Sequence, residues 1–292
     1  MIIDTDLVTA LVAEQFPRWR HLPIRLVDHN GWDNRTFRLG DSMSVRLPSA
    51  VGYVAQVDKE QRWLPVLAPR LPLQIPAPIA LGRPGAGYPW PWSVYRWIEG
   101  EPATSAPSFD RRVLAGDLGD FLQALQAVDS TGGPAAGDHS AWRGAHLRVY
   151  DADTRAALEV LRGHIDVGAA ATVWDAAMTS EWGGPPVWLH GDVAAGNLLL
   201  REGRLAAVID FGCSAIGDPS CDLVVAWTLF DMQNRALFAR HLSLDDGTWA
   251  RARGWALWKA LITAAQEIER RSEERSECWS VIDAVLEDRV QG

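Results

Sequence analysis

The chain has 292 residues, 48% of them hydrophobic, and a formal net charge of −9. This length allows a large buried core and favours one or two domains. Charged residues interrupt every apolar run long enough to cross a membrane, and the first residues lack the pattern of a secretion signal. The three cysteines have no Cys-x-x-Cys spacing, so free thiols are expected and not disulfides or a zinc site. We therefore expect a cytoplasmic protein with no membrane partner; its oligomeric state is left open.

Charge is distributed unevenly along the chain. Residues 1–98 carry 11 basic and 8 acidic side chains, and residues 99–292 carry 17 basic and 29 acidic ones. A nucleic-acid partner needs a basic track, so the acidic second part argues against one. This charge favours a cationic small molecule, although an acidic surface that only aids solubility would look the same.

The first 98 residues predict a small lobe with an antiparallel sheet. Short alternating runs separated by polar, glycine-containing turns predict strands at residues 25–27, 35–39, 43–47 and 88–98. Apolar residues at helical spacing predict a helix over residues 4–16, and a second helix is expected over residues 56–67. The last strand is expected to continue into the link between two lobes.

Residues 99–292 predict a larger, mostly helical lobe. Helices are predicted over residues 111–128, 151–162, 169–178, 249–271 and 277–288. Two short apolar strands, 187–189 and 205–209, frame a polar segment. The predicted domains are therefore residues 1–98 and 99–292.

That polar segment contains Asp192 and, five residues later, Asn197, and it is followed by Asp210-Phe211-Gly212. This ordered pair of motifs is typical of phosphoryl transfer. A substrate hydroxyl needs a carboxylate to accept its proton, so Asp192 is the candidate catalytic base. Mg²⁺ prefers carboxylate and amide oxygens, so Asn197 and Asp210 are the candidate metal ligands. Alone, each residue could equally be a helix cap or a turn residue, but their order argues against that interpretation.

The segments His190-Gly191-Asp192, Ile209-Asp210-Phe211-Gly212 and Gly217 to Leu223 resemble those of the aminoglycoside phosphotransferases and their small-molecule kinase relatives. The resemblance extends from about residue 28 to about residue 260. It implies an α+β, bilobal, protein-kinase-like fold, with ATP or GTP as phosphoryl donor and Mg²⁺ as cofactor. By the same resemblance, Asp218 and Asp222 brace the catalytic loop, and His190 is expected to orient it by hydrogen bonding.

The nucleotide end departs from the usual pattern at one position. Kinases place a Lys on a small-lobe strand and pair it with a helix Glu, and here the matching residues are Arg46 and Glu60. A guanidinium can hold phosphate oxygens with two donors, although Arg and Lys differ in geometry. The alternative is a surface arginine beside a structural strand.

The remaining nucleotide contacts are implied by the resemblance. The loop at residues 31–36 lacks the G-x-G-x-x-G pattern of protein kinases. The resemblance assigns the triphosphate to backbone amides around Asn34, in a turn able to bind an anion. It assigns the adenine to the backbone of Tyr95, Trp97 and Ile98.

The acceptor is expected to be an aminoglycoside or a similar amino-bearing antibiotic. Candidate carboxylates for binding it are Asp231, Glu267 and Glu269, the last two being too close in sequence to share one helix face. Acidic residues that simply face water are the alternative for each of them. Two other functions stay open: a kinase of another small metabolite, with a choline-, homoserine- or sugar-type acceptor, and a catalytically idle nucleotide-binding regulatory protein, which only Arg46 favours.

Overall fold

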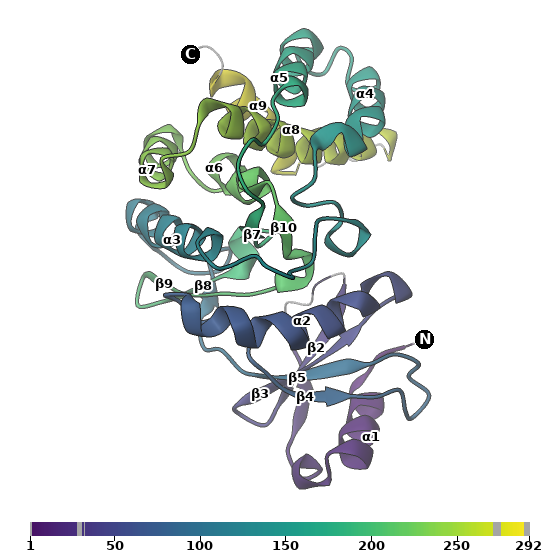
Figure 1. Ribbon diagram of the computed structural model, residues 1–292. Helices are drawn as coiled ribbons and strands as arrows, with labels where there is room; N and C mark the ends of the chain where they lie inside the picture. Colours follow the sequence, from purple (N-terminus) through teal and green to yellow (C-terminus); the bar gives the residue numbers. More distant parts are fainter. Residues whose placement is uncertain (1, 28–30, 32, 271–275, 289–292) are drawn as a thin grey trace.

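The computed structural model describes residues 2–27, 31, 33–270 and 276–288. Its smaller lobe is an antiparallel sheet in the order β1-β2-β3-β5-β4, with one helix on each side (Figure 1). The elements of this lobe are α1 (Thr5–Gln15), β1 (Ile24–Leu26), β2 (Asn34–Leu39), β3 (Met43–Pro48), α2 (Val54–Leu67), β4 (Pro78–Gly82) and β5 (Trp92–Arg96).

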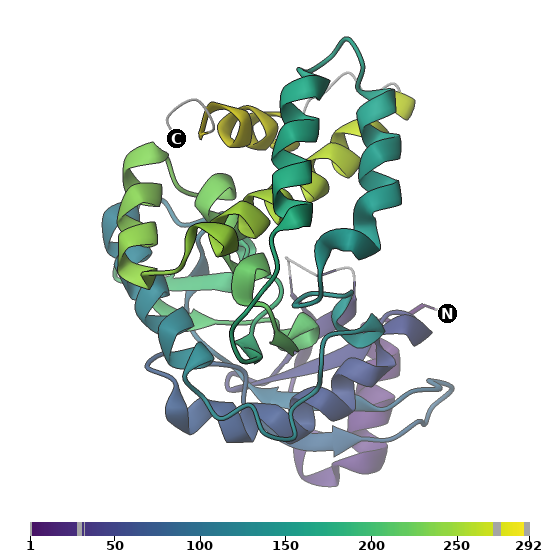
Figure 2. The same ribbon diagram turned by 45° about the horizontal axis from the view of Figure 1, so that its top comes forward.

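The larger lobe combines helices with two small sheets, β10-β7 and β6-β8-β9. Its helices are α3 (Arg111–Gln126), α4 (Asp151–Val160), α5 (Val167–Thr179), α6 (Val225–Thr228), α7 (Met232–Leu242), α8 (Asp246–Glu269) and α9 (Cys278–Glu287). Its strands are β6 (Glu101–Pro102), β7 (Val187–Leu189), β8 (Leu198–Arg201), β9 (Arg204–Val208) and β10 (Ala215–Gly217). Helix α8 packs against α4, α5 and α9, and Figure 2 shows α4 and α5 side by side in front of it.

Aspartates begin many of the helices. The first N–H groups of a helix lack partners within it, so a carboxylate just before the helix is a favourable acceptor. The carboxylates that accept such a backbone hydrogen bond are those of Asp4, Asp110, Asp166, Asp231 and Asp245. Some of the acidic residues of this chain therefore stabilise the first turns of helices.

Two hydrophobic clusters form the core. The smaller cluster joins α1 to the sheet through Val8, Leu11, Phe37 and Trp92. The larger cluster fills the helical lobe, and it also includes Leu64 and Leu67 of α2 and Tyr95 of β5. Because the C-terminal turns of α2 pack into the larger lobe's core, this helix is anchored to both lobes.

The predicted α+β class, with a small antiparallel-sheet lobe and a larger helical lobe, is confirmed. Three differences concern individual elements. The strand expected over residues 88–98 is shorter, because Gly85 and Tyr88 pair as a turn before β5 begins. Helices α6 and α7 and the short strands β4, β6, β8 and β10 were not predicted, since their apolar patterns are too brief to stand out.

The third difference concerns α2, whose polar residues Gln56, Lys59 and Glu60 are buried. A polar helix face normally faces water, but here it packs against the loop after β9 and against β5.

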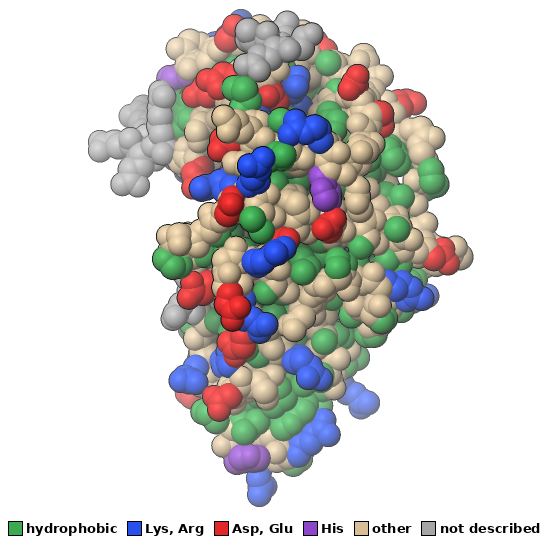
Figure 3. Space-filling view, turned by 90° about the vertical axis from the view of Figure 1, so that its left-hand side faces the viewer, with side chains coloured by type: hydrophobic (Ala, Val, Ile, Leu, Met, Phe, Trp, Pro, Cys, Tyr) green, Lys and Arg blue, Asp and Glu red, His purple; other side chains and the backbone are tan. Residues whose placement is uncertain are grey.

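The proposed boundary at residue 98 stays a prediction. Within the described residues, no helix is both long and apolar enough to cross a membrane. The face shown in Figure 3 carries acidic and basic side chains close together over both lobes.

Candidate active site

The catalytic-loop candidate begins directly after β7, where His190 is fully buried. Its Nδ1 accepts a hydrogen bond from the Asp192 backbone N–H (3.2 Å), and its Nε2 lies 3.0 Å from the Ile209 carbonyl oxygen. A carbonyl can only accept, so the proton of the neutral ring is on Nε2. His190 therefore links the loop of Asp192 to the residue before Asp210 by hydrogen bonds.

Asp222 binds the backbone at the start of the same loop. Its two carboxylate oxygens accept hydrogen bonds from the backbone N–H groups of His190 and Gly191, both at 2.7 Å. Burial raises the pKa of Asp222, while the two N–H groups favour the ionised form. A neighbouring carboxylate, Asp218, is instead paired with the buried Arg251 (2.7 Å). Of these two aspartates, only Asp222 contacts the loop directly.

Gly191 explains why the motif reads His-Gly-Asp. Its φ of +85° lies in the left-handed region, and a Cβ there would be 2.3 Å from the carbonyl oxygen of Cys213. A side chain would therefore be strained and would also displace the loop that follows Asp210. The glycine allows the two loops to pack directly against each other.

Asn197 joins the catalytic loop to the Asp-Phe-Gly segment. Its side-chain Nδ2 donates to the carbonyl oxygen of Asp192 (2.9 Å) and to the Asp192 carboxylate (3.2 Å). Its own carbonyl oxygen accepts from the backbone N–H of Ile209 (2.9 Å). These bonds connect Asp192 and Asn197 directly, and they connect Asn197 to the residue before Asp210.

Arg46 lies between two carboxylates. Its Nη2 is 2.9 Å from Oδ1 of Asp210, and its Nη1 is 3.5 Å from Oε1 of Glu60. Burial opposes its charge, but Glu60 and Asp210 more than offset that cost, so the pKa of Arg46 is raised. Burial raises the pKa of Glu60 as well, although Arg46 and the hydroxyl of Tyr95, which donates to Glu60, oppose that rise. Arg46 thus belongs to a buried ion network and is not a surface arginine.

A cavity of about 430 Å³ opens beside this network, between the two lobes. Its lining includes Asn34, Arg46, Tyr95, Trp97, Ile98, Asn197 and Asp210. Glu60 lies behind Arg46 and is not part of the lining, whereas Asp192 is exposed and is held beside the lining by Asn197. Residues from both lobes therefore converge on one concave site.

Two backbone details bear on the predicted nucleotide contacts. The amide of Trp97 already donates to the carbonyl oxygen of Ser42 (2.8 Å), so this N–H group is not available to a ligand. In the loop before β2, residues 28–30 and 32 lie outside the described residues, and the Nδ2 of Asn34 donates to the Asp33 carboxylate (3.0 Å). Burial raises the pKa of Asp33, and the nearby charge of Asp210 raises it further.

The three candidate acceptor carboxylates are not brought together with the catalytic loop by any hydrogen bond or ion pair in the described part of the chain. Asp231 caps α7 by accepting from the N–H of Asn234 (2.9 Å). Glu267 accepts from the indole Nε1 of Trp279 (2.8 Å), and Glu269 is exposed at the end of α8. Two of the three carboxylates therefore already have partners within the protein.

Sequence reasoning missed two residues beside this site, Asp33 and Lys59. Asp33 lines the cavity next to Asp210, and Lys59 donates hydrogen bonds to the backbone that follows Asp210. Lys59 could have been noticed because only Lys59 and Lys259 are lysines among the 28 basic Lys and Arg residues. No comparable signal marked Asp33, which precedes β2 directly.

Comparison with known proteins gave a family and several structural relatives. A family model described as the phosphotransferase enzyme family matches residues 25–255, whereas no curated protein matches. The GDP complex of aminoglycoside 2'-phosphotransferase-IIIa is similar with a TM-score of 0.74 and 18% identity, over 98% of this chain and all of that chain. The ADP-bound aminoglycoside phosphotransferase APH(2'')-Ib is similar with a TM-score of 0.61 and 18% identity, over 97% of both chains.

A macrolide 2'-phosphotransferase from Brachybacterium faecium has the same fold, with a TM-score of 0.61 and 21% identity over 96% of this chain and 98% of that chain. Such low identities show a shared fold, while the family match rests on the sequence over most of the chain. The resemblance first seen in the motifs around Asp192 and Asp210 is thereby confirmed. The chain belongs to the phosphotransferase enzyme family.

Proposed function

We propose that the protein transfers the γ-phosphoryl group of ATP or GTP to a hydroxyl of a small molecule. The observation that carries this proposal is the hydrogen bonding of Asn197 to Asp192 and to Ile209, the residue before Asp210, beside a cavity between the lobes that Asn197 and Asp210 line. Similar structures include complexes with GDP, with ADP and with ATP, which supports a nucleotide as donor. The carboxylate of Asp192, the side-chain oxygens of Asn197 and Asp210 and the guanidinium of Arg46 are the kinds of groups that phosphoryl transfer uses, and their closeness supports the proposal.

Each residue has a distinct role in this proposal. The exposed carboxylate of Asp192 accepts the proton of the acceptor hydroxyl as that oxygen attacks the phosphoryl group. Arg46, held by Glu60, neutralises charge on the donor phosphates. Backbone amides around Asn34 contact the phosphates, and the backbone of Tyr95, Trp97 and Ile98 holds the base.

The residues present fit Mg²⁺. The Nδ2 of Asn197 is used by Asp192, which leaves Oδ1 of Asn197 as an acceptor, and Arg46 occupies only Oδ1 of Asp210. One amide oxygen and one carboxylate are the kind of protein ligands that Mg²⁺ uses when phosphates and water complete its shell. When bound, the ion would neutralise charge on the transferred phosphoryl group.

For the acceptor we propose an aminoglycoside or a similar amino-bearing antibiotic. Structural relatives include a kanamycin complex, a streptomycin complex and a gentamicin complex, and residues 99–292 have a large acidic excess. Asp231, Glu267 and Glu269 remain the candidate carboxylates. Glu269 is the strongest of them, because it is exposed and forms no hydrogen bond or ion pair within the described residues.

An acceptor screen tests this proposal. Purified protein with Mg²⁺ and either ATP or GTP is assayed against aminoglycosides, other amino-bearing antibiotics and neutral or anionic metabolites. We expect turnover with an amino-bearing antibiotic, weakening as salt screens the attraction between charges. Efficient turnover of a neutral or anionic metabolite alone would refute the antibiotic acceptor but not the kinase. Nucleotide binding without turnover of any acceptor would instead indicate a regulatory protein.

The role of Asp192 gives a direct prediction. Asp192→Asn keeps size and polarity but removes the proton acceptor, so we expect a fall in kcat of roughly 10²–10⁴-fold with nucleotide affinity nearly unchanged. Steady-state kinetics and calorimetric titration with ADP measure the two quantities. A variant that kept more than about a tenth of the wild-type rate would fall outside this range and would show that Asp192 is not the catalytic base.

A further inference from the structure

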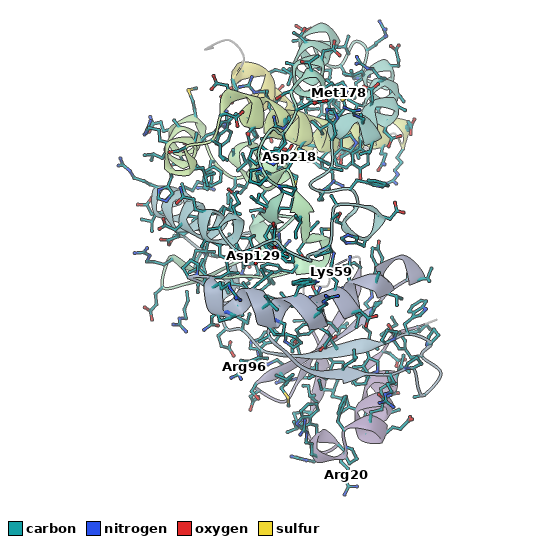
Figure 4. The ribbon with its side chains drawn as sticks, in the orientation of Figure 1. Arg20, Lys59, Arg96, Asp129, Met178 and Asp218 are labelled. Carbon is teal, nitrogen blue, oxygen red and sulfur yellow. The ribbon has the colours of Figure 1, made fainter. Side chains whose placement is uncertain are left out.

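A buried lysine joins helix α2 to the loop that follows Asp210. The Nζ of Lys59 lies 2.6 Å from the carbonyl oxygen of Gly212 and 3.0 Å from that of Ser214. It also lies 3.1 Å from both the carbonyl oxygen and Nδ1 of His139. Figure 4 shows Lys59 on the side of α2 that faces the larger lobe. One ammonium group thus binds a small-lobe helix to two segments of the larger lobe.

The chemistry of this site suits a lysine and not an arginine. Carbonyl oxygens surround the ammonium group, whose three N–H donors point in different directions, whereas a guanidinium presents a planar fork. The Nε2 of His139 lies 2.8 Å from the carbonyl oxygen of Ala135, so Nε2 carries the proton and Nδ1 is free to accept from Lys59. In a chain whose basic residues are almost all arginine, a lysine stands where this geometry is needed.

Burial destabilises the charged form of the Lys59 ammonium group. Burial lowers the pKa of Lys59 to about 8, opposed by Cys213 and Glu60. Within the described residues no carboxylate forms an ion pair with Lys59, so backbone carbonyls and His139 supply its hydrogen bonds. A buried cation on α2 that contacts the backbone of two segments of the larger lobe defines their relative positions more than it contributes to a core.

The neighbours of Lys59 connect it to the phosphoryl-transfer site. Glu60, the next residue of α2, binds Arg46, and Arg46 binds Asp210. Asp210 itself has a φ of +68°, a conformation that non-glycine residues adopt only when the surroundings hold them. The same turn of α2 is therefore connected to Asp210 in two ways. Glu60 binds Arg46, which binds Asp210, and Lys59 binds the backbone of the loop that follows Asp210.

We propose that Lys59 is a positioning residue for phosphoryl transfer, which fixes the loop of Asp210 against α2 so that the carboxylate faces the donor phosphates. This inference rests on the proposed function. Lys59 acts through the backbone of Gly212 and Ser214, and it contacts neither nucleotide nor acceptor.

The test measures how much Mg²⁺ strengthens ADP binding. ADP affinity is determined by calorimetry with Mg²⁺ and with EDTA, in wild type, in Lys59→Met and in Lys259→Met, which removes the exposed lysine of α8 as a matched control. In Lys59→Met we expect Mg²⁺-dependent affinity to fall about 10- to 100-fold, as for other residues that orient a metal ligand, with ADP affinity in EDTA little changed. Lys259→Met should match wild type.

A double variant separates positioning from general stability. In an Asp210→Ala background the ligand is already gone, so Lys59→Met should cause no further loss of the Mg²⁺ effect, whereas independent contributions would add. Melting temperatures identify variants that do not fold, and Lys59→Gln, which keeps N–H donors without the charge, replaces Lys59→Met if necessary. A normal Mg²⁺ effect in the folded Lys59 variant, or an additive loss, would overturn the inference. Absence of any Mg²⁺ effect in wild type would overturn the proposed function and this inference together.

Discussion

Single side chains at this site are shared between several partners. Arg46 uses one guanidinium nitrogen for Glu60 and another for Asp210, with only 14% of its side chain exposed. A lysine ends in a single nitrogen, so it would have to reach both carboxylates from one point. The Arg at this position is therefore compatible with kinase chemistry, because it maintains two contacts while still lining the cavity.

The Arg46 prediction follows from those two contacts. Arg46→Ala should raise KM for ATP and lower kcat, because it removes the phosphate contact and leaves the buried Glu60 without its cation. Arg46→Lys should retain part of the activity, since it keeps the charge but not both contacts. Steady-state kinetics compare the two with Arg25→Ala, an exposed arginine on β1. Normal kinetics in Arg46→Ala would show that the phosphates are held elsewhere.

The two candidate metal ligands should differ in strength. Asp210→Ala removes a charged oxygen ligand, whereas Asn197→Ala removes a neutral one, so the first should weaken Mg²⁺-dependent nucleotide binding more. Titration of Mg²⁺ at a fixed ADP concentration, followed by tryptophan fluorescence, measures the difference. Equal and small effects from both changes would point to a structural role for the two residues.

At the level of elements, strand pairing and hydrogen bonds from side chains to backbone hold the proposed catalytic loop. Strand β7 pairs antiparallel with β10, and the loops that extend from the two strands meet where Gly191 contacts Cys213. The imidazole of His190 and the carboxylate of Asp222 then hydrogen-bond to the backbone around Gly191 and Asp192. Neighbouring elements thus determine the position of Asp192, as the proposed role of a catalytic base would require.

Gly191 provides the test of that packing. Gly191→Ala and Gly163→Ala introduce a side chain at nearly the same φ, +85° and +81°, but only the first meets other atoms within 4 Å. Gly163→Ala should destabilise by about 1 kcal/mol from backbone strain. Gly191→Ala should cost about 1–3 kcal/mol more from the clash and should also lower kcat. Urea unfolding and kinetics check both; equal costs would mean that the loops can move apart freely.

At the scale of the whole molecule, a buried ion pair anchors the helical lobe. Arg251 of α8, only 2% exposed, binds the Asp218 carboxylate (2.7 Å) after β10 and the Ser180 hydroxyl (2.7 Å) after α5. These contacts tie the long helix α8 to the segment that leads from the Asp-Phe-Gly motif. Asp218 therefore supports the site at a distance, through the packing of the lobe.

Arg251→Ala should destabilise the protein by about 3–5 kcal/mol, because it leaves the carboxylate of Asp218 buried without a cation. The control is Arg155→Ala, which breaks exposed pairs with Asp151 of α4 and Asp175 of α5 and should cost at most about 1 kcal/mol for each pair. Urea unfolding followed by circular dichroism and tryptophan fluorescence measures both. Similar small costs would mean that water enters and replaces the buried pair.

Local patterns were enough to predict much of this protein. Helical and alternating periodicities identified α1, α2, α3, α8 and α9 and the central strands of the small lobe. An element that buries one face has apolar residues at a regular spacing, which can be read from the local sequence. The spacing of Asp192, Asn197 and Asp210 was also informative. Asp192 and Asn197 lie in one short loop after β7, and Asp210 lies in a short turn after β9, so the motifs can be read from neighbouring residues. Their roles in catalysis stay predictions.

Contacts between distant segments were decided only by the tertiary structure. The sequence by itself determined the two-lobed α+β class and the family through these local patterns. Which backbone carbonyls surround Lys59, and that Asp231 and Glu267 already have partners, depend on how helices and loops pack together. Every residue supplies a backbone acceptor, so residue type alone does not reveal which one a buried cation will meet.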